Sequence, residues 1–125
     1  MKREQISKNI VADLKELAAL TSDADGAQRV AWTPTFKKAT EWFTQKMQAA
    51  GADVWTDAAG NSWAKFAGES KECIVIGSHL DSVPDGGWLD GALGVVAGMG
   101  IGAYGLADKK PAKLFTLSVG QMKRV

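Results

Sequence analysis

The sequence contains little cysteine and histidine and no surplus of either charge. Cys73 is the only cysteine among 125 residues, which excludes an internal disulfide and any cysteine-rich zinc module. Fifteen Lys and Arg residues against fourteen Asp and Glu residues give a net charge of +1, so no basic surplus exists to neutralise nucleic-acid phosphates. With 46% hydrophobic and 23% charged residues, the composition predicts one globular domain rather than a disordered chain.

The chain also lacks a long hydrophobic run. Residues 1–5 lead into a charged amphipathic stretch, so we expect no secretory signal and a reducing cytoplasmic setting. The 17 uncharged residues 91–107 fall short of the roughly 20 that span a bilayer, which leaves a membrane-associated protein as a reserve interpretation. Gly94, Gly98 and Gly102 instead predict a buried helix that approaches a sheet closely.

Two helices are predicted in the amino-terminal half. The first, over residues 4–20, has one apolar face: Ile6, Ile10, Leu14 and Leu17. Asp13 lies off that face. The second begins with Thr33 as its N-cap and Pro34 at its first position, and it ends before Gly51. Both helices are interpreted as packing elements, with residues 21–26 as a loop.

The remaining elements are predicted to be strands of a mixed sheet. Residues 53–57 and 61–66 flank a three-residue turn that contains glycine and predict a hairpin. The apolar run 73–76, including its cysteine, predicts a strand buried on both faces of an α/β sheet. Residues 113–119 predict a further strand.

Polar residues follow the strand 73–76 abruptly, and ligands bind at such strand ends in α/β sheets. A lone histidine is more often structural than a ligand, but His79 has Asp81 two residues later and Asp90 in a glycine-rich loop. Imidazole and carboxylate are both zinc ligands, and Asp81 can accept the second imidazole N–H. These residues alone do not close a metal site. Arg29 is interpreted either as a contact for a carboxylate substrate or as a solvated surface residue.

The run 77–84 followed by 86–95 resembles the metal-binding signature of the M20 metallopeptidase-like amidohydrolases. Within that family it is most similar to the N-carbamoyl-L-amino-acid hydrolases, allantoate amidohydrolases and β-ureidopropionases. Residues 29–34 and 57–61 match the same branch in order and spacing, and the resemblance covers roughly residues 10–107. It implies a three-layer, zinc-peptidase-like α/β catalytic domain, here truncated, with a mixed sheet and flanking helices.

The resemblance also implies an activity and a set of residue roles. The family hydrolyses a C–N bond of N-carbamoyl amino acids or related ureido compounds, which are small molecules, with two zinc ions or, alternatively, manganese. His79 would ligate one metal, Asp90 would bridge both, and Asp81 would orient His79. A metal-bound water would attack the carbonyl carbon, with a glutamate as general base.

The chain departs from the family pattern after residue 117. The family's general base belongs to a Glu-Glu pair after the next core strand, but no glutamate follows Glu72 and His79 is the only histidine. Asp85 is a remote substitute ligand. We therefore expect residues 1–125 to be the amino-terminal part of the catalytic domain, without the dimerisation domain and inactive alone. The alternative is a non-catalytic metal- or partner-binding remnant that self-associates through an exposed sheet edge.

Overall fold

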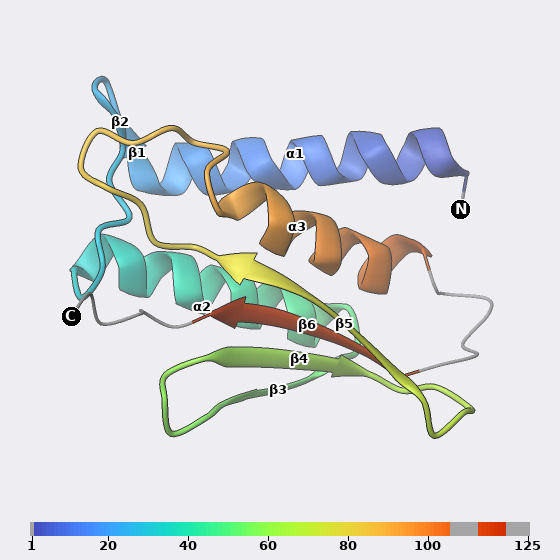
Figure 1. The fold of residues 1–125 in the computed structure, drawn as a ribbon. Helices are drawn as coiled ribbons and strands as arrows, with labels where there is room; N and C mark the ends of the chain where they lie inside the picture. Colours follow the sequence, from blue (N-terminus) through green and yellow to red (C-terminus); the bar gives the residue numbers. More distant parts are fainter. Residues whose placement is uncertain (1, 106–112, 120–125) are drawn as a thin grey trace.

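A four-stranded sheet with helices on one face makes up the chain (Figure 1). The computed structural model describes residues 2–105 and the path of the strand Lys113–Val119. The strand order is β3-β4-β6-β5, where β6 runs antiparallel to β4 and parallel to β5. The strands are β3 (Asp53–Thr56), β4 (Ser62–Phe66), β5 (Cys73–His79) and β6 (Lys113–Val119). The predicted mixed sheet is confirmed.

The predicted three-layer arrangement is not what the described residues form. Figure 1 places α1 (Arg3–Thr21), α2 (Pro34–Ala49) and α3 (Ala92–Gly100) on the same side of the sheet. The part of the chain that the structure describes is therefore a two-layer α/β arrangement, with no helix on the opposite face of the sheet.

Both amino-terminal helices form where the sequence predicts them. Leu14 and Leu17 of α1 are buried in the core. The Thr33 side chain accepts a hydrogen bond from the Phe36 backbone N–H at 3.2 Å, as its N-cap assignment requires, and Pro34 is the first residue of α2. Asp13, which the sequence places off the apolar face of α1, is nevertheless buried and only 6% exposed.

Two hairpins connect these elements. β3 and β4 pair antiparallel around residues 57–61, as predicted. The expected loop 21–26 contains a second, short hairpin, in which β1 (Ser22–Asp23) pairs with β2 (Gly26–Ala27). A single bridge between Ala27 and Gly86 joins this hairpin to the glycine-rich loop that precedes α3.

The uncharged stretch forms α3 and a following π-helical turn, η1 (Ile101–Gly105). A Cβ atom on Gly94 would lie 2.7 Å from the Ser78 Cβ, and one on Gly102 would collide with the Phe66 ring. Glycine at these two positions therefore allows the helix to pack directly on the sheet, as the sequence predicts. Within residues 2–105, no helix has both the length and the apolar character needed to cross a bilayer.

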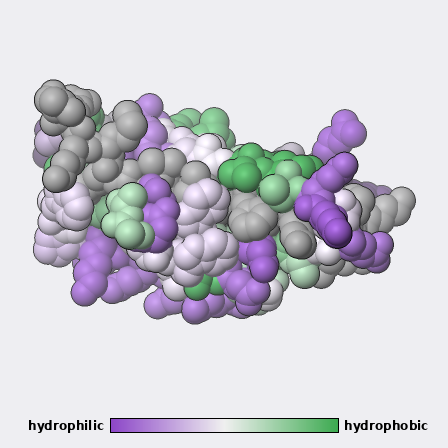
Figure 2. Space-filling model, turned by 60° about the horizontal axis from the view of Figure 1, so that its bottom comes forward, coloured by the Kyte–Doolittle hydropathy of each residue, from purple (hydrophilic) through white to green (hydrophobic). Residues whose placement is uncertain are grey.

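The prediction that β5 is buried on both faces is wrong. Cys73 is exposed, and Ile74 and Val75 are 54% and 53% exposed. β5 is the last strand in the sheet order, and Ile74 and Val75, which point to opposite faces because side chains alternate along a strand, are both left uncovered near its beginning. Figure 2, which brings the underside of Figure 1 forward, shows hydrophobic side chains gathered on this side of the molecule.

Candidate metal site

His79 is the last residue of β5, and its imidazole is paired with Asp81. The His79 Nδ1 atom lies 3.1 Å from both the Oδ1 atom and the backbone oxygen of Asp81. Both atoms are acceptors, so Nδ1 carries the proton in this arrangement and Nε2 keeps its lone pair. The pair therefore leaves Nε2 as the ring nitrogen that can bind a ligand.

Asp90 lies one residue before Gly91, whose backbone packs directly against His79. Gly91 has φ +70, and a Cβ atom there would collide with the His79 ring and its backbone oxygen. Only glycine combines this left-handed conformation with such a close approach. The Ala92 N–H donates to the backbone carbonyl of Asp90 at 2.8 Å, so the Asp90 backbone is fixed at the amino-terminal end of α3. The structure thus brings the loop that carries Asp90 against the imidazole.

The three predicted site residues do not by themselves form a compact set of ligands. In the described part of the chain, the one group of three potential ligand atoms within 4.8 Å of one another comes from Asp23, Asp25 and Asp85, all exposed. Asp85, the remote candidate, therefore belongs to this separate acidic group beside the β1–β2 hairpin. Its side chain accepts a hydrogen bond from the Gln28 amide at 2.7 Å.

Arg29 is neither a solvated surface residue nor an accessible contact for a substrate, the two alternatives that the sequence suggests. Its side chain is completely buried. Its Nε–H donates to the Leu80 carbonyl at 2.6 Å, and Nη1 donates to Thr21 Oγ1 at 3.4 Å. The Ser82 N–H in turn donates to the Arg29 carbonyl at 2.8 Å. Arg29 is therefore an internal connection between the amino-terminal segment and the end of β5.

The guanidinium also links the two predicted carboxylates electrostatically. Burial lowers the pKa of Arg29, and the negative charges of Asp81 and Asp90 act against that change. An arginine stays protonated in proteins, so the group is a buried positive charge that acts electrostatically on both carboxylates without forming an ion pair with either. The one sequence signal for this role is the position of Arg29 in the family-like run 29–34.

A short ladder of hydrogen bonds holds the loop after β5 in place. The Ala27 and Gly86 backbones exchange hydrogen bonds of 2.8 and 3.0 Å. Ser82 Oγ donates to the Ala27 carbonyl at 3.3 Å, and the Asp85 N–H donates to the Gln28 side-chain oxygen at 3.1 Å. Residues 27–29 and 80–86 therefore form one joined unit next to His79.

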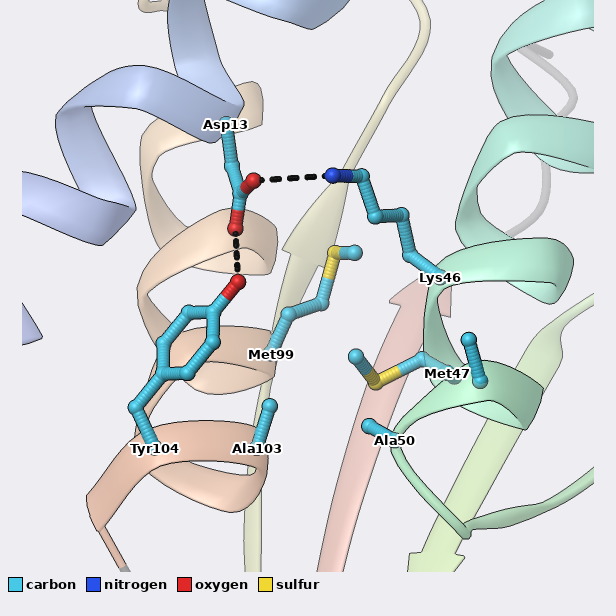
Figure 3. A pocket seen from close by; sticks show the side chains of 8 residues that line it. Asp13, Lys46, Met47, Ala50, Met99, Ala103 and Tyr104 are labelled. Atoms are coloured by element: carbon cyan, nitrogen blue, oxygen red, sulfur yellow. Dashed lines mark hydrogen bonds and ion pairs between the residues drawn. The ribbon is translucent and has the colours of Figure 1, made fainter.

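A second polar cluster lies in a cavity of about 310 Å³ between α1, α2 and η1 (Figure 3). Asp13 Oδ1 is 3.1 Å from Lys46 Nζ, and Tyr104 donates to Asp13 Oδ2 at 2.9 Å. Burial alone lowers the pKa of Lys46, but hydrogen bonds to Glu16 and Asp13 outweigh it and raise this pKa. Both Asp13 oxygens are satisfied, and the cluster serves as a polar connection between helices.

No protein-family model matches the chain, but curated relatives do. An N-carbamoyl-L-amino-acid amidohydrolase of Paenarthrobacter aurescens is 35% identical over 95 residues, which cover 74% of this chain and 23% of the relative. Allantoate deiminase 1 of Glycine max is 40% identical over 90 residues, covering 70% of this chain and 18% of the relative.

Solved structures agree with these relatives. The crystal structure of an amidase of the hydantoinase/carbamoylase family from Burkholderia phymatum matches with a TM-score of 0.78 and 33% sequence identity. The match covers 88% of this chain and 28% of that chain. The present chain therefore spans about a fifth of the two curated relatives, 23% and 18% of their lengths, and over a quarter of the solved one.

Proposed function

The chain belongs to the hydantoinase/carbamoylase (M20-like) amidohydrolases as a homologue of part of their length, and from this premise we propose its function. Residues 1–125 are the amino-terminal, metal-binding part of a catalytic domain that hydrolyses a C–N bond of N-carbamoyl amino acids or related ureido compounds. The supporting observation is the His79–Asp81 pair at the end of β5, with the Asp90 loop packed against the same imidazole. We expect a cytoplasmic enzyme.

The donor set of this chain fits zinc as one part of a site. Nε2 of His79 and the exposed carboxylate of Asp90 are ligand types that zinc prefers, and manganese accepts them too. A zinc ion takes three or four protein ligands, whereas His79 is the only histidine of the chain. The remaining ligands and the general base would come from residues outside these 125.

Each residue of the site has a defined task in this proposal. Asp81 holds the proton on Nδ1 of His79 and thereby keeps Nε2 available for coordination. Asp90, with two carboxylate oxygens, would be shared by two metal ions. Zinc bound there would polarise the substrate carbonyl and lower the pKa of a bound water. The negative charges of Asp81 and Asp90 in turn help to keep the buried Arg29 guanidinium protonated.

Zinc binding by the 125-residue chain tests this proposal. We expect the purified chain to bind zinc weakly, because it supplies only two of the three or four protein ligands that a zinc ion takes, and isothermal titration calorimetry should give an affinity that depends on His79. The substitution Asp81→Asn should weaken binding by about 10–100-fold, as loss of an orienting carboxylate does elsewhere. Loss of a ligand in His79→Gln or Asp90→Asn should weaken it at least as much.

The acidic group beside the β1–β2 hairpin provides the matched control. Asp25→Asn removes one of three exposed carboxylates that lie within 4.8 Å of one another. This variant should bind zinc as the unsubstituted chain does. Zinc binding that survives His79→Gln and disappears in Asp25→Asn would contradict the proposed site.

The structure also favours a second, non-catalytic function. β5 is the last strand of the sheet, so one of its edges is open, and it carries Ile74 and Val75 on its two faces, both more than half exposed. Exposed strands of this kind pair readily with another chain. The alternative is therefore a metal- or partner-binding remnant that associates with a second copy of itself through β5.

A further inference from the structure

Arg29 is buried in a way that packing alone does not explain. It is the largest fully buried side chain of the described residues, and it carries a positive charge. No carboxylate of the described residues lies within ion-pair distance of it, and its Nη2 atom has no hydrogen-bond partner among them. Burying an unpaired charge is costly, so a residue kept in this state requires a compensating role.

Arg29 holds the chain on both sides of Asp81. Its side chain donates to the carbonyl of Leu80, the residue before Asp81. Its backbone carbonyl accepts from the N–H of Ser82, the residue after Asp81. Asp81 is thus fixed between two hydrogen bonds to the same residue, and its Oδ1 atom faces His79 Nδ1 at 3.1 Å.

We infer that Arg29 is the positioning residue of the candidate metal site, setting the orientation of Asp81 and through it the tautomer of His79. The inference rests on the proposed function, because the Nδ1–H tautomer matters only if His79 binds a metal. An imidazole protonated on Nδ1 is the form that offers Nε2 to a metal. Arg29 itself touches neither substrate nor metal in this role.

The chemistry of arginine suits the role better than that of lysine. The bond to Leu80 comes from Nε, inside the planar guanidinium, while Nη1 reaches Thr21 on the other side. A lysine has one terminal nitrogen on a flexible stem and cannot hold both acceptors in a fixed plane. Lysine would retain the positive charge but lose the geometry.

Nitrogen NMR of the single histidine tests the inference without metal. Because His79 is the only histidine, its two ring nitrogens are assigned without ambiguity. At about pH 8.5, where imidazole is ordinarily neutral, we expect the Nδ1–H tautomer to dominate in the unsubstituted chain. In Arg29→Gln the ratio of Nδ1–H to Nε2–H tautomers should fall at least about tenfold, the effect of weakening one hydrogen bond to a charged group. Arg29→Lys should give an intermediate ratio.

Lys46→Gln is the control, because it removes a different cation, partly buried and bonded to Asp13 and Glu16. It should lower thermal stability and leave the His79 tautomer ratio unchanged. If Arg29 only filled space in the core, its variants would behave in the same way, and that result would overturn the inference. If both Arg29 variants fail to fold, the unsubstituted chain provides the test. A mixed tautomer population of His79 would then overturn the inference, and a dominant Nδ1–H form with a slowly exchanging Ser82 amide would support it.

Zinc titration separates this inference from the proposed function. An Arg29-dependent tautomer in a chain that does not bind zinc would support the positioning role and contradict the metal site. Zinc binding that requires His79, together with a tautomer that is indifferent to Arg29, would support the metal site and contradict the positioning role.

Discussion

At the level of single residues, Asp57 organises the turn between β3 and β4. Its carboxylate accepts hydrogen bonds of 2.9 Å from the Trp63 indole N–H, the Asn61 side-chain amide, and the backbone N–H groups of Asn61 and Ala59. These bonds, that of Trp63 first, lower the pKa of Asp57 to about 2. The turn is therefore held by the ionised form of one side chain.

Substituting Asp57 should make the stability of the chain depend less on pH between about 4 and 2. A carboxyl group with a lowered pKa in the folded state contributes stability above its unfolded pKa of about 4 and loses it as pH falls toward 2. We expect Asp57→Ala to lower the melting temperature by several degrees at neutral pH and to match the unsubstituted chain near pH 2. Circular dichroism melts across this range measure the effect. Asp53→Ala, at an exposed position of β3, is the control, and an equal loss at all pH values in Asp57→Ala would contradict the prediction.

His79 and Arg29 differ in how far their roles can be predicted from sequence. His79 follows an apolar strand directly, so the general rule about strand ends indicates its place. Arg29 has no such local signal. Its acceptor Leu80 lies 51 residues away in the sequence, and an arginine in a segment that connects two helices is ordinarily exposed. A buried charge is defined by contacts that only the folded chain brings together.

At the level of elements, β5 shows where local sequence stops being informative. Four consecutive apolar residues predict a strand correctly, because β-branched side chains favour extended backbone. They do not predict what covers the strand, since this depends on the sheet order and on which face the helices occupy. The α2 boundaries were predictable for the opposite reason: the Thr33 cap and Pro34 act within one turn of the helix.

The open edge of β5, the last strand of the sheet, leads to a prediction of self-association. We expect light scattering to show that the 125-residue chain dimerises as its concentration rises, with β5 and its exposed Ile74 and Val75 at the contact. Val75→Lys should raise the dimer dissociation constant at least about tenfold, or about 1.4 kcal/mol, because a lysine there opposes strand pairing. Val11→Lys, at an exposed valine of α1, should leave the dimer unchanged. A monomer at every concentration would count against the contact.

At the level of the whole molecule, the described residues include the elements that position His79 and the Asp90 loop, although the chain supplies only some of the metal ligands. β5 ends at His79, α3 begins after Gly91, and residues 27–29 join the loop between them. The core that holds these parts lies between the helices and one face of the sheet. The mixed sheet with flanking helices could be predicted from the resemblance, but the position of all three helices on one face could not, because it depends on contacts between segments far apart in the sequence.

This partial site leads to an expected lack of hydrolysis by the chain alone. Enzymes of this chemistry need a general base and enough ligands to hold the metal, whereas the chain has one histidine and no glutamate after Glu72. With N-carbamoyl amino acids and zinc, we expect ammonia release at the uncatalysed rate, against the roughly million-fold or larger accelerations of enzymes. His79→Ala is the matched control: turnover that persists in it would come from a contaminant. Zinc-dependent turnover that His79→Ala abolishes would show that the 125 residues already contain a working base, and Asp81 would then be the first residue to test for that role.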